Sequence, residues 1–358
     1  MLWKVCVVIP AKNEGPGIRE VISDVRAAFD PEKFAPPLVL VVDDSTDDTR
    51  RHVREASARV IIGGGRGLGA AMYLGLKEAV TYGPDFIVTI DGDGQADAKE
   101  IGQFLQPLMD DQADLVLGSR FKQPGLVHYR YRWRNRLGTV VLARILRSFT
   151  KLKITDSHGG VRAMRRTVAA ELEMLGTHTY VQETIIDAAE KGFRIIELPS
   201  VWKKRQHGGS RVVSSIPRYV FYTFPILMLR SGQHIRLLYS AGIGLVLFAS
   251  LYFFIVLAEA GFNIKATGDR VPAFTFIALL FSLGFQFFFF GLVLQLTKQI
   301  KYRVDQVLPT RRTELEEGGA NPILKKRTID ERELAGRRDW DWETGSAARG
   351  GGERAEVR

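Results

Sequence analysis

The chain has 358 residues, enough for one good-sized soluble domain with additional segments. Its net charge of +10 suits nucleic acid, an anionic membrane or phosphorylated substrates equally, so charge alone selects none of them. The single cysteine, Cys6, excludes an internal disulfide and gives no reason to expect an oxidising compartment. The apolar run at residues 5–9 is too short for a signal peptide.

Apolar segments alternate with helical patterns through the first third of the chain. Strands are predicted at Lys4–Pro10, Leu38–Val42, Arg59–Ile62, Phe86–Ile90 and Asp114–Gly118, with a helix after each of the first four. This alternation predicts an α/β domain with a mostly parallel sheet, in which ligands lie at the carboxyl ends of the strands. The polar clusters PAKNE, DDSTDD and DGDGQ all fall at such ends.

A glycine-rich segment, GGGRGLGAAM, follows the third predicted strand. Gly65, Gly67 and Ala70 fit the dinucleotide-binding pattern GxGxxA, and Asp91 follows at about the 20-residue distance which that pattern expects. The position on the third strand and the doubled acid of DGD argue against a dinucleotide site. A phosphate-binding turn and a purely structural turn are the other interpretations.

DGDGQ ends the fourth predicted strand. Because side chains alternate along extended backbone, Asp91 and Asp93 point to one side, with Gln95 as a third candidate. Two close carboxylates raise each other's pKa unless a cation lies between them, and Mg²⁺ or Mn²⁺ favours such oxygen ligands. A plain polar turn is the alternative. An EF-hand fits poorly, since Ala96 and Gly102 stand where glycine and glutamate are needed.

Arginine and aromatic residues mix in the segment Val127–Thr150, which also carries an apolar helical stripe. RNA binding, contact with a lipid surface and a plain solvated helix are the three interpretations. Further on, DSHGGVRAMRR at Asp156–Arg166 predicts a tight turn with clustered arginines. KKRQHGGSRV places Arg205 and Arg211 around a flexible glycine pair.

Two long apolar runs, Leu237–Ala258 and Val271–Thr297, contain no charge. Each exceeds the roughly 20 residues that a membrane-spanning helix needs, and basic flanks at both outer ends predict a hairpin with those ends on the cytoplasmic side. A helical hairpin buried in a soluble protein is the alternative. Ser215–Arg230 predicts an interfacial helix. Gln286 and Gln295 need polar partners, across the hairpin or in another subunit.

The motifs IPAKNE, VDDSTDDT, GLGAAM, DGDGQ, LGSRF, DSHGGVRAMRR and GGSRV occur in an order that resembles family 2 glycosyltransferases of the GT-A fold. More narrowly, Val5–Thr297 resembles the polyprenyl-phosphate sugar synthases, the group of the dolichol-phosphate mannose and undecaprenyl-phosphate glucose synthases. The resemblance implies inverting transfer of a hexose from a GDP-mannose or UDP-glucose type of donor to polyprenyl phosphate at the cytoplasmic membrane face, with Mg²⁺ or Mn²⁺ as cofactor.

The resemblance also implies roles for individual residues. The pocket for the nucleotide sugar would comprise Pro10, Lys12, Glu14, Val42, Asp44, Asp91 and Gly92. The metal ligands would be Asp91, Asp93 and Gln95. The catalytic residues would be Asp93 and the phosphate-binding Arg120, Arg205 and Arg211. Lys12 stands where the family commonly has an aromatic residue, Arg211 where it often has lysine, and DSHGGVR where it more often has SGFR or CGFR.

The expected organisation is a GT-A catalytic domain at 1–212, a juxtamembrane interfacial helix at 213–234, two transmembrane helices at 235–300 and a charged, disordered tail at 301–358. Both termini would be cytoplasmic. The expected partners are a nucleotide-diphosphate sugar, polyprenyl phosphate and the membrane, without nucleic acid, and a homo-oligomer stays open. Three alternatives remain: a membrane glycosyltransferase with another lipid or polysaccharide acceptor, a membrane-bound dinucleotide oxidoreductase and a non-catalytic scaffold.

Overall fold

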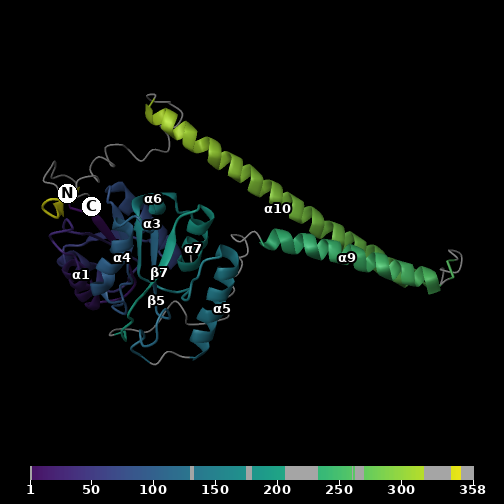
Figure 1. Cartoon of the computed structure of the whole chain (residues 1–358), viewed down its shortest axis with the longest axis horizontal. Coiled ribbons are helices and arrows are strands. Elements are labelled where there is room, and N and C mark those ends of the chain that lie inside the picture. The colour runs from purple at the N-terminus through teal and green to yellow at the C-terminus, as the bar shows by residue number, and fades with distance from the viewer. Residues whose placement is uncertain are drawn as a thin grey trace. The chain divides into compact units, whose positions relative to one another are not determined.

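A computed structural model covers the chain and describes residues 2–129, 133–174, 180–205, 233–259, 261–262, 270–317 and 340–347. The chain divides into two compact units (Figure 1). The first comprises Met1–Arg230 with Ile329–Arg358, and the second comprises Ser231–Thr328.

The first unit is built on a seven-stranded sheet. Its strands are β1 (Val5–Ala11), β2 (Leu38–Asp43), β3 (Arg59–Ile62), β4 (Phe86–Thr89), β5 (Leu115–Ser119), β6 (Arg162–Arg165) and β7 (Ile195–Pro199). They lie in the order β3-β2-β1-β4-β6-β5-β7. Only β6 runs antiparallel to its neighbours, β4 and β5. The prediction of a mostly parallel sheet in an α/β domain is therefore confirmed.

Helices cover both faces of this sheet (Figure 1). They are α1 (Gly17–Ala27), α2 (Thr49–Glu55), α3 (Leu68–Thr81), the 3₁₀ turn η1 (Ala98–Glu100), α4 (Ile101–Met109), α5 (Trp133–Thr150), α6 (Arg166–Glu171) and α7 (Val181–Glu190). Alternate residues of β1 enter two separate cores, with Val7 in one and Cys6 in the other. Burial of each large aliphatic side chain contributes about 1.5–3 kcal/mol, which explains why the strands read as continuous apolar runs.

The second unit is a pair of helices, α9 (Gln233–Glu259) and α10 (Val271–Glu317). Glycines let them approach closely, since a Cβ on Gly242 would lie 2.8 Å from the carbonyl oxygen of Gly284. Tyr239 Oη donates to Gln295 Oε1 at 2.8 Å, so the prediction that Gln295 finds a partner across the pair is confirmed. Ile235–Glu259 and Val271–Thr297 are long and apolar enough to cross a membrane, and only 17% of each apolar window is buried. A soluble core hairpin would bury far more.

The tail differs from the predicted disorder at two places. Helix α10 continues to Glu317, and a small hairpin of β8 (Trp340–Asp341) and β9 (Ser346–Ala347) belongs to the first unit. Trp340 packs against the core and lies 5.6 Å from the Arg59 guanidinium, so burial of an indole offsets the charged composition around it. The predicted interfacial segment up to residue 232 and Arg211 lie outside the described residues.

Candidate functional site

The DGDGQ turn leaves β4 and lies tightly against the end of β1. A Cβ on Gly92 would be 2.9 Å from the carbonyl oxygen of Pro10, so only glycine allows this approach. Gly94 has a φ of 69°, a conformation that glycine adopts without strain. The Asp93 carboxylate accepts a hydrogen bond from the backbone N–H of Gln95 at 3.0 Å. The sequence thus folds into a turn that presents Asp91 and Asp93 at the carboxyl end of a central strand.

The two carboxylates of this turn hold their protons unusually strongly. Partial burial and the neighbouring charge of Asp93 raise the pKa of Asp91 to about 7, against the opposing charges of Arg162, Arg120 and Arg205. Burial also raises the pKa of Asp93, although the Gln95 N–H and Arg205 oppose the shift. Such a pair gains from a cation placed between its members.

The paired glycines of DSHGG form the opposite wall of the site. A Cβ on Gly160 would overlap the Asp91 carboxylate, and one on Gly159 would overlap the carbonyl oxygen of Gly118. Arg162, two residues beyond, is buried, and its Nη2 donates to the Val181 carbonyl at 2.8 Å. The turn predicted from sequence is therefore a surface fitted to Asp91, and Arg162 acts on that carboxylate from within the core.

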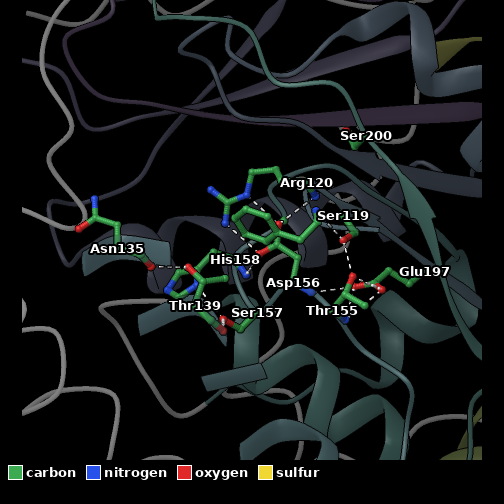
Figure 2. Close-up of polar contacts among 12 residues, drawn as sticks. Ser119, Arg120, Asn135, Thr139, Thr155, Asp156, Ser157, His158, Glu197 and Ser200 are labelled. Carbon is green, nitrogen blue, oxygen red and sulfur yellow. Dashed lines mark hydrogen bonds and ion pairs between the residues drawn. The ribbon is translucent and has the colours of Figure 1, made fainter. Parts of the chain in front are cut away.

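Arg120 of LGSRF forms a buried ion pair with Asp156. Its Nε and Nη2 donate to the two carboxylate oxygens at 2.7 and 2.8 Å, and its backbone N–H donates at 3.1 Å (Figure 2). The guanidinium is 6% exposed and lies 4.9 Å from the ring of Trp202. Burial alone raises the pKa of Asp156, but Arg120 and the His158 N–H outweigh it and bring the pKa below its ordinary value. This fork binds a carboxylate of the protein itself.

A second carboxylate, Glu197 of β7, fixes the segment around this pair. It accepts hydrogen bonds from the backbone N–H groups of Thr155 and Asp156 and from the Thr155 hydroxyl, at 2.7–3.0 Å. The Thr155 hydroxyl also lies 2.7 Å from that of Ser119 (Figure 2). The DSHGG turn is thereby attached to the end of β5 and to the middle of β7.

Arg205 connects two of the predicted clusters. Its Nη2 lies 3.0 and 3.2 Å from the oxygens of Glu14 and 3.4 Å from Asp93. Glu14 is held in turn by the Thr49 hydroxyl, which accepts from its backbone N–H at 3.0 Å. The loops after β1 and β4 thus meet at one guanidinium, and Thr49, which follows β2, holds the first of these loops, as expected for the carboxyl ends of parallel strands.

The glycine-rich segment before α3 closes over Asp44. The Gly65 N–H donates to Asp44 Oδ1 at 2.8 Å, and a Cβ on Gly63 would meet the same oxygen at 2.5 Å. Gly64 and Gly67 have φ values of 79° and 106°. The backbone N–H groups that the dinucleotide interpretation would assign to a cofactor therefore include one that holds a carboxylate of the protein.

The remaining predicted residues are distributed around these loops. Lys12 is exposed and Pro10 is half-buried at the end of β1. The Val42 side chain lies in the core, where a Cβ on Gly75 would meet it at 2.7 Å, so only its backbone reaches the strand end. The side-chain nitrogen of Gln95 donates to the Lys203 carbonyl at 3.4 Å.

Comparison with known proteins identifies the kind of molecule. The family model for glycosyl transferase family 2 matches residues 6–173. An uncharacterized glycosyltransferase of Mycobacterium tuberculosis is 32% identical over 214 residues, covering 59% of this chain and 91% of that protein. The chain belongs to glycosyl transferase family 2. The prediction of an enzyme of this class is confirmed, and a dinucleotide oxidoreductase is excluded.

A further relative and a solved structure are also similar to this chain. The chain is 29% identical over 201 residues to a dolichyl-phosphate hexose transferase of Haloferax volcanii, covering 56% of this chain and 82% of that protein. A crystal structure of glucosyl-3-phosphoglycerate synthase from Mycobacterium tuberculosis, in complex with Mg²⁺ and uridine diphosphate, superposes with a TM-score of 0.50 at 19% identity, over 64% of this chain and 80% of that one. The predicted GT-A fold is confirmed.

The site of this glycosyltransferase has suitable ligands for a divalent metal ion. Asp91 and Asp93 are two carboxylates of one turn whose pKa values are raised, mainly by burial, and a cation bound between them would favour their charged forms. Within the described part of the chain, no group of three or more acidic, histidine or cysteine side chains is placed to hold a metal ion by itself. Two carboxylates still suffice for Mg²⁺, which usually keeps positions for water and substrate phosphates.

Sequence reasoning misses Asp156, the carboxylate partner of Arg120, and Glu197, which holds the segment before Asp156. The sequence separation of Arg120 and Asp156 is 36 residues, and no local spacing predicts such a contact. The available signal was composition: an acid precedes a glycine pair and a run of arginines in DSHGGVRAMRR. A buried arginine needs a carboxylate, and that requirement alone would have directed attention to Asp156.

Proposed function

We propose that this family 2 glycosyltransferase transfers a hexose, with inversion, from a nucleotide-diphosphate sugar of the GDP-mannose or UDP-glucose type to polyprenyl phosphate. The observation that carries the proposal is the Asp91 and Asp93 pair, set within the electrostatic reach of Arg120, Arg162 and Arg205. Similarity to a dolichyl-phosphate hexose transferase and the presence of two apolar helices support the lipid acceptor.

Donor binding is assigned to the loops after β1, β2 and β4. Asp91 and Asp93, with Gln95 beside them, would hold Mg²⁺ or Mn²⁺, which supplies positive charge where negative charge develops on the leaving diphosphate. Glu14 and Asp44 present fixed carboxylates to hydroxyl groups of a nucleoside, because Arg205 orients one and the Gly65 N–H the other. Lys12 is exposed beside them and provides a cation for the donor phosphates.

Acceptor activation requires no general base, because a lipid phosphate is already anionic at neutral pH. The obstacle is repulsion between two anions, and arginine side chains remove it. An acceptor phosphate would compete with Glu14 and Asp93 for Arg205, and Arg211 of the GGSRV motif would add a second charge. Arg120 is held by Asp156, so it would act on the bound phosphates through the electric field of its positive charge. Alignment of both substrates contributes on the order of 7 kcal/mol in favourable cases.

The helix pair would anchor the enzyme where its acceptor is dissolved. Arg218, Arg230 and Arg236 precede the apolar run Leu237–Ala258, and Lys298, Lys301 and Arg303 follow the second run. This distribution supports a cytoplasmic catalytic unit and cytoplasmic termini. A cysteine-accessibility map of the 260–269 loop in sealed vesicles checks this orientation.

The test is product formation. The purified full chain is incubated with polyprenyl phosphate, Mg²⁺ or Mn²⁺ and a panel of labelled GDP- and UDP-sugars, and the lipid extract is examined for label. One donor should yield a labelled polyprenyl-phosphate sugar, and Asp93→Ala should not. Absence of product from every donor, or transfer only to another lipid or a polysaccharide, contradicts the proposal.

A further inference from the structure

Helix α5 has an exposed apolar side. The exposed fractions are 70% for Trp133, 55% for Leu137, 41% for Val140 and 50% for Val141. Their spacing of four, three and one residues places them on one side of the helix, here called the α5 outer face. In the described part of the first unit, the other exposed large hydrophobic residues are Leu2, Trp3 and Ile62, far from α5 in sequence. A gathering of this kind on a soluble domain marks an interaction surface.

The same helix is strongly basic. Its 18 residues include Arg134, Arg136, Arg144 and Arg147 and no acidic residue. Arg136, Arg144 and Arg147 are exposed, and Arg144 follows Val140 by one helical turn. Apolar side chains, an exposed tryptophan and several arginines on one helix fit the interface of an anionic bilayer. There the apolar side chains contact acyl chains and the arginines bind lipid phosphates.

The opposite side of α5 is attached to the active site. Thr139, Ala143 and Leu146 are buried on that side. The Ser157 hydroxyl donates to the Thr139 carbonyl at 3.2 Å, and Ser157 follows Asp156, the partner of Arg120 (Figure 2). Helix α5, which exposes the apolar face, is therefore hydrogen-bonded to the DSHGG turn, which packs against Asp91.

We propose that the α5 outer face docks on an anionic lipid bilayer. A bilayer is the occupant favoured over RNA or a protein partner because the same chain carries two helices able to span one, and because the exposed charge on α5 is entirely positive. Docking at α5 would bring the carboxyl ends of the strands to the bilayer surface. This last consequence, delivery of a lipid acceptor to Arg205, rests on the proposed function, whereas the docking itself does not.

The experiment uses a label at Val141. Cys6 is fully buried, so Val141→Cys in the full chain gives one accessible thiol for a fluorophore that reports polarity. Asp110→Cys, an exposed position at the opposite ends of the strands, is the matched control. In vesicles with about one-third anionic lipid, brominated acyl chains should quench the label at 141 and not that at 110. Equal quenching at both positions, or none at 141, overturns the proposal.

Two further readouts separate the alternatives. If RNA, and not lipid, shifts the emission of the label at 141 toward that of an apolar environment, the α5 outer face binds nucleic acid and bilayer docking is overturned. If the same shift occurs without lipid as the protein concentration rises, the face binds a second copy of the chain and bilayer docking is likewise overturned. Leu137→Asp should lower turnover about tenfold or more with acceptor in vesicles and leave turnover with a short water-soluble acceptor unchanged. If no acceptor is ever used, the quenching result still stands, so failure of the proposed reaction and failure of docking are distinguishable.

Discussion

Two acidic turns meet at the centre of this enzyme, and their carboxylates behave in opposite ways. Asp156 is buried and Asp91 is partly buried, and Gly160 of the first turn packs directly against Asp91 of the second. The pKa of Asp156 is lowered, whereas that of Asp91 is raised to about 7. Asp156 accepts three hydrogen bonds from Arg120. Asp91 faces another carboxylate at close range.

This contrast shows that the nearest partner decides what a buried carboxylate does. Asp156 has its compensating cation within the protein, so its role is to hold Arg120 and the turn in place. We propose that a bound cation compensates Asp91 and Asp93, so that their role is binding. Substitutions in the two turns should therefore divide into losses of stability and losses of activity.

The largest effect is expected for Asp156→Ala. This change leaves the buried Arg120 charge without its carboxylate, which costs about 3–5 kcal/mol of folding free energy. Denaturant unfolding of the detergent-solubilised chain, monitored by tryptophan fluorescence, measures the loss. Asp110→Ala, an exposed carboxylate at the end of α4, serves as control and should change little. A loss below about 1 kcal/mol would mean that Asp156 is not the structural carboxylate.

Asp93→Ala should do the reverse. Turnover should fall about 100-fold or more, because a charge-stabilising contact at the leaving diphosphate is lost. The unfolding free energy should stay within about 1 kcal/mol of wild type, since removing one of two repelling charges costs little. Asp91→Ala should weaken donor binding as well. Full activity in Asp93→Ala would reduce DGDGQ to an ordinary turn.

His158 gives the DSHGG turn a pH signature. Burial and the Arg120 charge lower its pKa to about 4, whereas the unfolded chain has about 6.5. The unfolded state therefore binds the proton first, and stability present above pH 6.5 is lost as the pH falls toward 4. Between pH 7 and 5 the loss is about 2 kcal/mol. In His158→Asn, unfolding measured at both pH values should show a correspondingly smaller loss, and an equal loss would assign the effect elsewhere.

The smallest predicted effect concerns Arg205. Arg205→Ala should lower turnover about tenfold, the low end for loss of a charge-assisted contact. Since a single nitrogen, Nη2, contacts both Glu14 and Asp93, a lysine ammonium can replace it, and Arg205→Lys should recover most of the activity. Steady-state rates of the three proteins at saturating donor provide the comparison. Equal losses in both variants would show that the planar fork matters.

The fold and half of the site were readable from sequence. Strands such as Val5–Ala11 alternate between two cores and are locally recognisable, and the polar residues that follow them define the carboxyl edge. Asp91 and Asp93 were found because their spacing is itself local. The hydrogen bonds of Gly65 to Asp44 and of Arg120 to Asp156 join residues distant in sequence, so no sequence motif predicts these contacts.

The tail shows a limit of predictions that rest on composition. Its charged composition predicts disorder, yet Trp340 packs on the core and a Cβ on Gly345 would lie 2.5 Å from Pro36. Composition averages over a segment, whereas one partly buried indole can attach a short hairpin to the core. The antiparallel insertion of β6 between β4 and β5 was likewise invisible, because pairing partners are chosen by the whole sheet.

The most direct measurement is Mn²⁺ binding to the full chain in the presence of uridine or guanosine diphosphate, followed by electron paramagnetic resonance. Wild type should bind one Mn²⁺ per chain, and the nucleotide should tighten the binding. Asp93→Asn should weaken Mn²⁺ binding about tenfold or more, whereas Asp110→Asn should not. Unchanged Mn²⁺ affinity in Asp93→Asn would contradict the assignment of this acidic pair as the metal site on which the proposed transfer depends.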